Sequence, residues 1–303
     1  MDISSIKKVR VGDYNGYILT YKSSKLQIIS DLGCNPNLLI LNGQQLLDGN
    51  TTPEDLKNHT ISKGDFLAPF PNRISEGKYT FAGTKHQLYI NEPDRGHALH
   101  GLIVDKKYTL HSSDTFDGGV TATFVTTMDA DECAGYPFNL EIAITFTLKE
   151  CELAIEMSGK NKGSTEAPFG VGWHPYFTTG GKIDDLYLTL PAKSILKTDN
   201  IKELIPTGKK QPNIFGTIKK KIGDTKFDTC FTDLEAQSVL FENIELFMDN
   251  QMKFVQAYTP DGRISIAIEP MSCAPDAFNN GMGLQILKPQ ESITYSFGIR
   301  IHS

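Results

Sequence analysis

The sequence predicts an all-β protein that folds as a sandwich or a barrel. Apolar and polar residues alternate with a period of two along much of the chain, which is typical of strands that bury one face. Turn-forming residues separate these runs at short intervals. Helical patterns are nearly absent. These three observations together favour packed or closed sheets over helical layers.

The clearest strands form a hairpin in the middle of the chain. Alternate residues are apolar in Asn139–Lys149, and 151–158 continues the pattern after the polar pair Lys149-Glu150. Such a polar pair between two alternating runs predicts a tight antiparallel turn. The same alternation predicts further strands at 16–21, 78–82, 120–126, 186–190, 239–247, 253–259, 264–269 and 293–301.

One short helix is expected near residue 52. Thr52 is a suitable cap, Pro53 suits the first turn, and Glu54 and Asp55 place acids near the helix N-terminus. No repeat, low-complexity tract or Pro/Ser linker divides the chain, so we expect residues 1–303 to form a single domain. Long connections are expected at about 50–75, 91–105 and 161–182, and loops of this length often carry function.

Composition excludes several classes of partner. The 303 residues carry a net charge of −6, so the clustered basic surface that nucleic acid requires is not expected. No apolar stretch is long enough to span a bilayer, and the first residues lack the apolar segment of a signal peptide. The five cysteines are widely spaced without a CxxC pair, which fits reduced thiols. We therefore expect a cytoplasmic protein that binds neither nucleic acid nor membrane.

The first candidate cluster surrounds Asn72 and Arg73. A Pro-rich, extended approach precedes Arg73 and holds its backbone stiffly. A rigid guanidinium suits a fixed polar target such as sugar hydroxyls. The same segment also fits a surface arginine that only pairs with a carboxylate, and this segment alone slightly favours that second interpretation.

The second cluster contains His97 and His100. In an extended segment, this odd spacing points the two side chains to opposite sides, which disfavours a shared metal ion. The His-x-His pattern with a nearby Glu that a cupin-type metal site needs is missing here. We therefore expect no metal, a structural hydrogen-bonding role for one histidine, and a functional role for His100, which precedes Gly101.

The third cluster places the only tryptophan, Trp173, beside His174, a proline and two further aromatics. Flat aromatic rings pack against the C–H faces of sugars, and an imidazole exchanges protons near neutral pH. A purely structural role fits the same residues equally well, with the aromatic rings packed in the core and the histidine fully hydrogen-bonded.

The fourth cluster is the end of the strand at 264–269. Ile264, Ile266 and Ile268 share one face, whereas Glu269 lies on the other, just before a rigid proline. A carboxylate at such a position would face a cleft, and partial burial would raise its pKa toward that of a useful base. An exposed glutamate is the simpler alternative.

Two weaker candidates complete the set. Asp228 lies between apolar neighbours, as a buried acceptor would, and Gln256 shares a strand face with Phe254 and Tyr258. No G-x-G-x-x-G, P-loop or nucleophile elbow occurs, so nucleotide and nicotinamide cofactors have no anchor. We expect no cofactor.

Taken in order, these clusters resemble the aldose 1-epimerase (mutarotase) family. Each motif is short, but together they follow the family's order along almost the whole chain. The Phe-Pro-Asn-Arg and Glu-Pro-Met variants are similar to the broad aldose 1-epimerase-like branch. The motifs are Asn72-Arg73-Ile74 with Gly77, Leu99-His100-Gly101, Gly135-Tyr136-Pro137, His174-Pro175-Tyr176-Phe177, Gln256-x-Tyr258-Thr259, Glu269-Pro270, and Pro275-Asp276-Ala277-x-Asn279.

The resemblance implies a large antiparallel β-sandwich of the galactose mutarotase-like type, the supersandwich. It also implies that the protein interconverts the α and β anomers of a free aldose. Glu269 would be the general base, His174 the general acid, and His100 would assist at the ring oxygen. The residues that would hold sugar hydroxyls are Asn72, Arg73, Asp228 and Gln256.

Two other classes of protein remain open at this point. A glycosidase would need two carboxylates about 5–10 Å apart, and Asp228 is the obvious partner for Glu269. A non-catalytic sugar-binding module would keep the aromatic and arginine positions without needing both His174 and Glu269. We expect a neutral aldohexose as the substrate, with Arg95 as the one further cation near the site, and a monomer or a weak homodimer.

Overall fold

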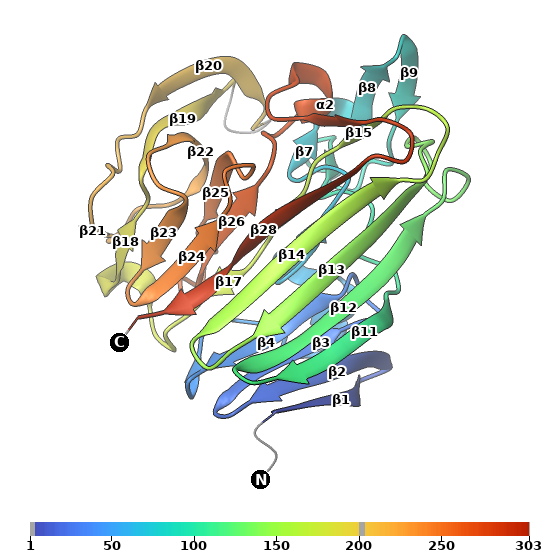
Figure 1. Cartoon of the computed structure of the whole chain (residues 1–303). Helices are drawn as coiled ribbons and strands as arrows, with labels where there is room; N and C mark the ends of the chain where they lie inside the picture. Colours follow the sequence, from blue (N-terminus) through green and yellow to red (C-terminus); the bar gives the residue numbers. More distant parts are fainter. Residues whose placement is uncertain (1–3, 200–203, 303) are drawn as a thin grey trace.

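The computed structural model describes residues 4–199 and 204–302, and antiparallel strands dominate it (Figure 1). All ladders between its named strands are antiparallel, because the alternating segments are joined mainly by tight turns and loops. The predicted all-β class and the large antiparallel sandwich are therefore confirmed.

The largest sheet runs across the front of Figure 1 and holds the hairpin expected from sequence. Its inner positions alternate strictly with solvent-facing ones in β13, as the sequence pattern requires. Its strands, in spatial order, are β11 (Thr109–Phe116), β12 (Gly119–Met128), β13 (Leu140–Leu148), β14 (Glu152–Asn161), β28 (Ser292–Ile301), β24 (Ile244–Met248), β23 (Ser238–Phe241), β18 (Tyr187–Thr189) and β21 (Lys220–Lys221).

A second large sheet packs behind the first and carries the residues of interest. Its strands, in spatial order, are β20 (Pro206–Pro212), β19 (Ala192–Thr198), β22 (Asp228–Leu234), β25 (Phe254–Tyr258), β26 (Ile266–Met271), β16 (Gly172–Trp173) and β6 (Phe66–Leu67), with β17 (Tyr176–Phe177) also paired to β26. Aromatic rings fill the space between the sheets. The ring centroids of Phe66 and Phe146 of β13 are 5.9 Å apart, and those of Trp173 and Phe297 of β28 are also 5.9 Å apart. This layer fixes the position of β16, which precedes His174.

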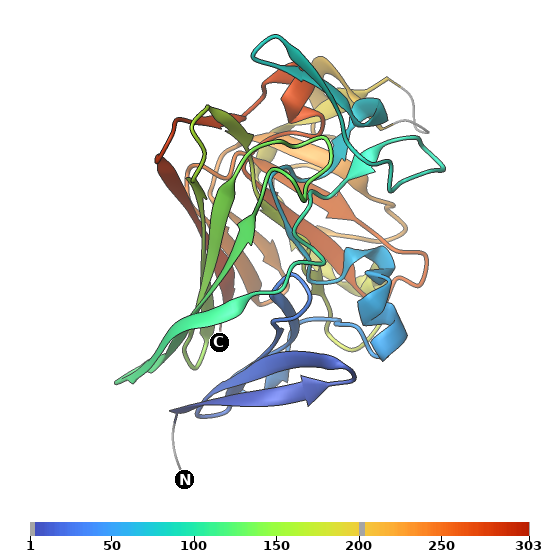
Figure 2. The same ribbon diagram turned by 90° about the vertical axis from the view of Figure 1, so that its right-hand side faces the viewer.

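The N-terminal strands form a third sheet at one end of the molecule, blue in Figures 1 and 2. Tyr17 of this sheet packs edge-on against Phe124 of β12, with ring centroids 5.2 Å apart. Its strands are β1 (Ser4–Val11), β2 (Tyr14–Tyr21), β3 (Ser24–Ile29), β4 (Asn35–Leu41) and β5 (Gln44–Gln45).

Short elements complete the described chain. The expected helix is α1 (Pro53–Lys57), and Thr52 caps it in a capping box with Asp55. The other elements are α2 (Ala277–Asn280), the 3₁₀ turns η1 (Thr60–Ser62), η2 (Ser75–Gly77) and η3 (Ile183–Asp185), and the strand pairs β7 (Arg73–Ile74) with β10 (Ala98–Leu99), β8 (Lys78–Phe81) with β9 (Thr84–Gln87), and β15 (Ala167–Phe169) with β27 (Gln285–Leu287). None of the described helices is long and apolar enough to cross a membrane.

Three sequence-based expectations need correction. The run 239–247 is two strands, β23 and β24, because Glu242-Asn243 turns the chain between them. Ile264 lies outside β26 and is half exposed, so it does not share the buried face with Ile266. The connections at 50–75, 91–105 and 161–182 contain short strands, whose few residues give too little alternation to detect.

Candidate active site

Strand register brings the acidic and amide candidates together on the second large sheet. Gln256 of β25 lies opposite Glu269 of β26 and, on its other side, opposite Cys230 of β22, two residues after Asp228. Val255 and Ala257 point into the main core, so the alternate residue Gln256 faces the opposite side of the sheet. The Gln256 Nε2 donates a hydrogen bond of 2.8 Å to Asp228 Oδ1.

A two-residue antiparallel ladder joins the cluster around Asn72 and Arg73 to the cluster with His97 and His100. Arg73 and Ile74 of β7 pair with Leu99 and Ala98 of β10. The ladder continues as a hydrogen bond of 2.9 Å from the His100 backbone N–H to the Asn72 carbonyl. Both Asn72 and His100 have left-handed backbones, with φ of 56° and 65°. The candidates that sequence analysis placed in separate segments are therefore neighbours.

Glycine is needed directly after His100. Gly101 has φ of +79°, and a Cβ built on it would lie 2.2 Å from the Ala68 carbonyl oxygen. Only glycine lets the chain approach the Ala68 backbone this closely. This contact fixes the start of the segment that follows His100.

His174 and Glu269 lie side by side at the floor of a cleft. The His174 Nε2 is 3.3 Å from Glu269 Oε1, and both side chains are almost fully buried. His100 packs edge-on against His174, with ring centroids 5.1 Å apart, and Tyr176 stacks flat on its ring at the same distance. We refer to His100, His174 and Glu269 as the cleft floor.

Burial shifts the proton equilibria of the cleft floor toward the neutral forms. It raises the pKa of Glu269 well above its ordinary value, and the nearby Asp228 carboxylate adds to the rise. It lowers the pKa of His174 to about 3. The pKa of His100 is also lowered, by burial and by the neighbouring His174 and Arg73. Burial therefore favours the arrangement in which a proton shared by the pair sits on the carboxyl group and the imidazole is neutral.

The cleft floor has hydrogen-bonding capacity that the described residues leave unused. Three of its buried polar atoms lack a partner among residues 4–199 and 204–302: Glu269 Oε2, His174 Nδ1 and His100 Nδ1. Buried polar atoms are normally paired, and each unpaired one costs roughly 1–3 kcal/mol. Such atoms mark a place where a polar ligand would complete the hydrogen bonding.

Arg73 is more buried than Arg95, the other cation that lines the cavity, and Glu92 holds it. Arg73 Nε and Nη2 each donate a hydrogen bond of 2.8 Å to the two Glu92 oxygens, the fork geometry typical of arginine and carboxylate. Glu92 was not among the sequence-based candidates, because an acid in an irregular loop has no distinguishing pattern. Arg73 therefore pairs with a carboxylate, as one of the two sequence-based interpretations expected, and it also lines the cleft.

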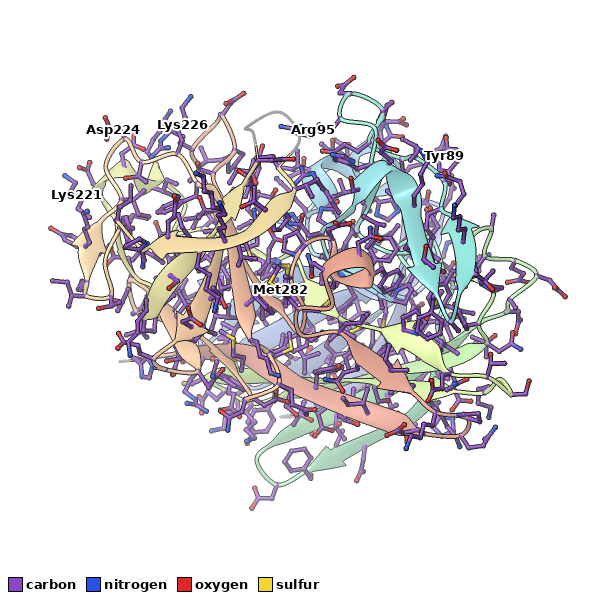
Figure 3. The ribbon with its side chains drawn as sticks, turned by 90° about the horizontal axis from the view of Figure 1, so that it is seen from above. Tyr89, Arg95, Lys221, Asp224, Lys226 and Met282 are labelled. Atoms are coloured by element: carbon purple, nitrogen blue, oxygen red, sulfur yellow. The ribbon has the colours of Figure 1, made fainter. Side chains whose placement is uncertain are left out.

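Asp228 and Arg95 form the outer part of the cleft. Asp228 is open to solvent at the cleft mouth, yet the surrounding walls raise the pKa of its carboxyl group by desolvation, against the pull of Arg73 and Arg95. Arg95 Nη1 lies 3.4 Å from Glu92 Oε1, and its buried Nε has no partner in the described chain. Seen from above, Arg95 lies at the edge between the strands β19–β20 and the segment with β8 and β9 (Figure 3).

All seven sequence-based candidates border one cavity of about 270 Å³. This volume lies just below the usual 300–1,000 Å³ of ligand pockets and suits a small molecule. The cleft continues into a second space of about 590 Å³ over β19 and β22. The cavity is also lined by Arg95, which was expected near the site. The other lining residues, which were not among the candidates, are Ile61, Ser62, Glu92, Leu99, Tyr176 and Tyr258.

The remaining motif residues have structural roles. His97 is buried and accepts a hydrogen bond of 3.1 Å from the Glu76 backbone N–H, in line with the structural role expected for one of the two histidines. Trp173 does not face the cleft, because it stacks between Phe66 and Phe297 in the core. Sequence analysis left both roles of this aromatic cluster open, and the structure divides them between Trp173 and His174. The groups of three or more potential metal ligands that would define a metal site do not occur in the described residues.

The described residues thus combine an antiparallel β-sandwich with a small cleft in which a buried carboxyl group lies beside an imidazole. A family model described as "Aldose 1-epimerase" matches residues 23–300. This chain therefore belongs to the aldose 1-epimerase family.

Comparisons with individual proteins agree. The chain is 33% identical over 238 residues to the uncharacterized protein YihR of Escherichia coli, covering 74% of each chain. It is 32% identical over 150 residues to the galactose mutarotase of Mus musculus, which is 48% of this chain and 41% of that protein. Among solved structures, a galactose mutarotase-like protein from Clostridium acetobutylicum covers 100% of both chains with a TM-score of 0.87 and 18% identity. The galactose 1-epimerase of Lactobacillus acidophilus covers 99% of this chain and 98% of its own, with a TM-score of 0.82 and 15% identity.

Proposed function

We propose that this protein is an aldose 1-epimerase that interconverts the α and β anomers of a free neutral aldohexose. The observation that carries the proposal is the His174–Glu269 pair, 3.3 Å apart on the floor of a cavity of about 270 Å³. Membership of the family and the motif order support the same reaction.

Anomer exchange needs one group that accepts a proton and one that donates a proton. The C1 hydroxyl loses a proton while the ring oxygen gains one, and the C1–O5 bond breaks. Rotation about C1–C2 turns the carbonyl, and the reverse steps close the ring on its other face. The site ends with the protons it had at the start, so a pair that holds one proton is sufficient.

Glu269 and His174 divide these tasks. In the reactive complex the pair's proton resides on His174, which donates it toward the ring oxygen while Glu269 takes the proton of the C1 hydroxyl. His100, 5.1 Å away between ring centroids, supports the imidazole on the ring-oxygen side. A positioned acid or base typically contributes about 10²–10⁴-fold each. Asn72, Arg73, Asp228 and Gln256 orient the sugar by hydrogen bonds to its hydroxyls.

The charges around the cleft favour a neutral substrate. Two N–H groups of Arg73 are already committed to Glu92, and a phosphate would need free guanidinium or ammonium groups aimed at it. Arg95 is the further cation that lines the cavity, and it too lies beside Glu92.

The acid–base pair also separates this proposal from a glycosidase. The group next to Glu269 is an imidazole. A glycosidase would use a second carboxyl about 5–10 Å away, for which Asp228 lines the same cavity, but it would leave His174 and His100 without a role. A sugar-binding module would not need a buried carboxyl group in contact with an imidazole, whereas this pairing suits proton transfer.

Polarimetry tests the proposal directly. We expect the purified protein to accelerate mutarotation of at least one free aldohexose from a panel that includes glucose and galactose, beyond the spontaneous rate. Glucose 6-phosphate at equal concentration and low salt should react more slowly than glucose. Hydrolysis of aryl glycosides, or sugar binding without acceleration, would instead point to the glycosidase or the binding module. A preference for the phosphate that Arg95→Ala abolishes would overturn the neutral substrate.

A further inference from the structure

The segment from His59 to Asp65, between α1 and β6, has an unusual backbone. His59, Ile61 and Ser62 all adopt left-handed conformations, with φ of 46°, 49° and 57°. These values are unfavourable for residues other than glycine, above all for the β-branched Ile61, and they persist only where contacts hold them. We call this segment the His59 loop. Ile61 and Ser62 line the candidate active site, so the loop conformation shapes it.

His59 bridges two carboxylates that lie on different segments. Its Nδ1 is 3.0 Å and 3.1 Å from the two oxygens of Asp65, and its Nε2 is 3.1 Å from Asp105 Oδ1. Carboxylate oxygens only accept hydrogen bonds, so both ring nitrogens donate and the ring is an imidazolium. Burial opposes this charge, but the hydrogen bonds to Asp105 and Asp65 prevail and raise the pKa of His59 to about 10.

The inner partner of this bridge is firmly placed. Asp65 is buried, and its Oδ1 accepts a second hydrogen bond of 2.9 Å from Asn35 Nδ2. Asp65 thereby forms a fixed point in the core. Asp105, in contrast, is exposed and joins the outer side of His59 to the loop after β10.

The far end of the His59 loop is bonded to the backbone of His174. The His174 N–H donates to the Asp65 carbonyl, and the Gly64 N–H donates to the His174 carbonyl, each at 2.9 Å. Tyr176, which stacks on the His174 ring, donates its hydroxyl hydrogen bond of 2.9 Å to the Ile61 carbonyl. The His174 Nδ1 has no partner among the described residues, so these contacts, together with His100 and Glu269, determine where the ring lies.

We infer that His59 is a positioning residue for the reaction. As a doubly bonded imidazolium it holds the His59 loop in its left-handed conformation, and the loop in turn fixes the backbone of His174 and the ring of Tyr176. His59 does not line the cavity itself, so it acts through these residues and not on the sugar. The inference rests on the proposed function for its effect on rate, but its effect on loop structure can be measured separately.

The primary test compares His59→Gln with the wild type by polarimetry. Glutamine keeps a donor for one carboxylate but removes the charge and the second hydrogen bond. We expect kcat per folded molecule to fall about tenfold, since a catalytic group misplaced by 1 Å can cost about 10²-fold, with a smaller change in KM. His111→Gln is the matched control, because His111 is an exposed histidine on β11, and its kcat should equal the wild-type value. An unchanged kcat for His59→Gln with only a lower melting temperature would overturn the inference.

Two further measurements keep the test decisive. Tyr176→Phe removes the hydroxyl bond to Ile61, so the double variant should lose less than the product of the two single losses if both act through the loop. Hydrogen–deuterium exchange at the Gly64 and His174 amides should accelerate in His59→Gln and not in His111→Gln, whether or not the wild type proves to be a mutarotase. Unchanged exchange at both amides would also reject the inference. If His59→Gln does not fold, Asp105→Asn at the surface removes the outer carboxylate charge, and the same readouts apply.

Discussion

The cleft floor and the end of strand β14 bury polar side chains in opposite ways. Asn161, at the end of β14, is almost fully buried and uses its whole amide. Its Nδ2 donates to the carbonyls of Thr165 and Leu287 at 2.7 Å and 2.8 Å, and its Oδ1 accepts from the Gly163 N–H at 2.9 Å. In the cleft floor, by contrast, Glu269 and both histidines leave buried atoms unpaired within the described residues.

Whether a buried polar side chain is fully hydrogen-bonded distinguishes structural residues from functional ones better than its burial does. A buried polar group that is fully hydrogen-bonded stabilises the fold, because it replaces the water it lost. A buried polar group that lacks partners costs stability and is retained where a ligand or a reaction uses it. Three substitutions and one change of pH test this difference between the cleft floor and Asn161.

The largest effect is expected from Glu269→Gln. The amide keeps the shape of the side chain but cannot accept the C1 hydroxyl proton, so mutarotation should fall about 10³-fold. The neutral amide also removes the cost of burying a carboxyl group, so the melting temperature at neutral pH should not fall. Polarimetry and thermal denaturation measure both properties.

Glu156→Gln provides the control for this variant. Glu156 is an exposed glutamate on β14, and its replacement should leave rate and stability unchanged. A Glu269→Gln variant with near wild-type activity would refute the role of Glu269 as the base.

Asn161→Ala should have the opposite effect, a loss of stability without a loss of activity. The change removes three hydrogen bonds, of which the one to the Leu287 carbonyl is buried, and this should lower the free energy of unfolding by about 3 kcal/mol. The kcat of the protein that remains folded should stay at the wild-type value. Urea denaturation and polarimetry at a temperature where the variant is folded make the measurement. A selective loss of kcat with normal stability would contradict the comparison.

A smaller effect is expected from Asp228→Asn. Asp228 lies at the cleft mouth and accepts a hydrogen bond from Gln256, so the amide should weaken sugar binding without removing a proton-transfer group. We expect KM to rise about tenfold, equivalent to about 1.4 kcal/mol, with kcat changed much less. Asp224→Asn, an exposed site away from the cavity (Figure 3), is the control. A loss mainly in kcat would instead assign Asp228 a part in the chemistry.

The smallest change is expected on mild acidification. The pair needs one proton in total, and this state is lost only when His174 also becomes protonated or when Glu269 loses its proton. Burial lowers the pKa of His174 to about 3, so the acid limit lies well below the range of an ordinary histidine. Burial also raises the pKa of Glu269, so the carboxyl group keeps its proton to a higher pH than an ordinary glutamate does. The kcat should therefore stay nearly constant between pH 7 and pH 5, where an ordinary histidine of pKa about 6.5 would titrate. Polarimetry corrected for spontaneous mutarotation gives the profile, and a decline centred near pH 6.5 would show that His174 titrates like an exposed histidine.

Much of the fold followed from local patterns. The alternation in β13 and β14 specified the central hairpin, and Thr52 with Pro53 specified α1, because caps and alternation are properties of neighbouring residues. Several strands were missed, including the first strand of the chain and β22. They are short, irregular or polar at the surface, and their pairing depends on partners elsewhere in the chain.

The residue types and their order along the chain indicate which residues form the candidate site, since they carry the family resemblance. The arrangement of these residues depends on contacts between distant segments. The short ladder between β7 and β10 joins Arg73 to the segment of His100, register sets Gln256 opposite Glu269, and Glu92 holds Arg73. The physical reason is that hydrogen bonding and proton affinity depend on which distant segments meet and how much water they exclude, and neither quantity is encoded in local periodicity.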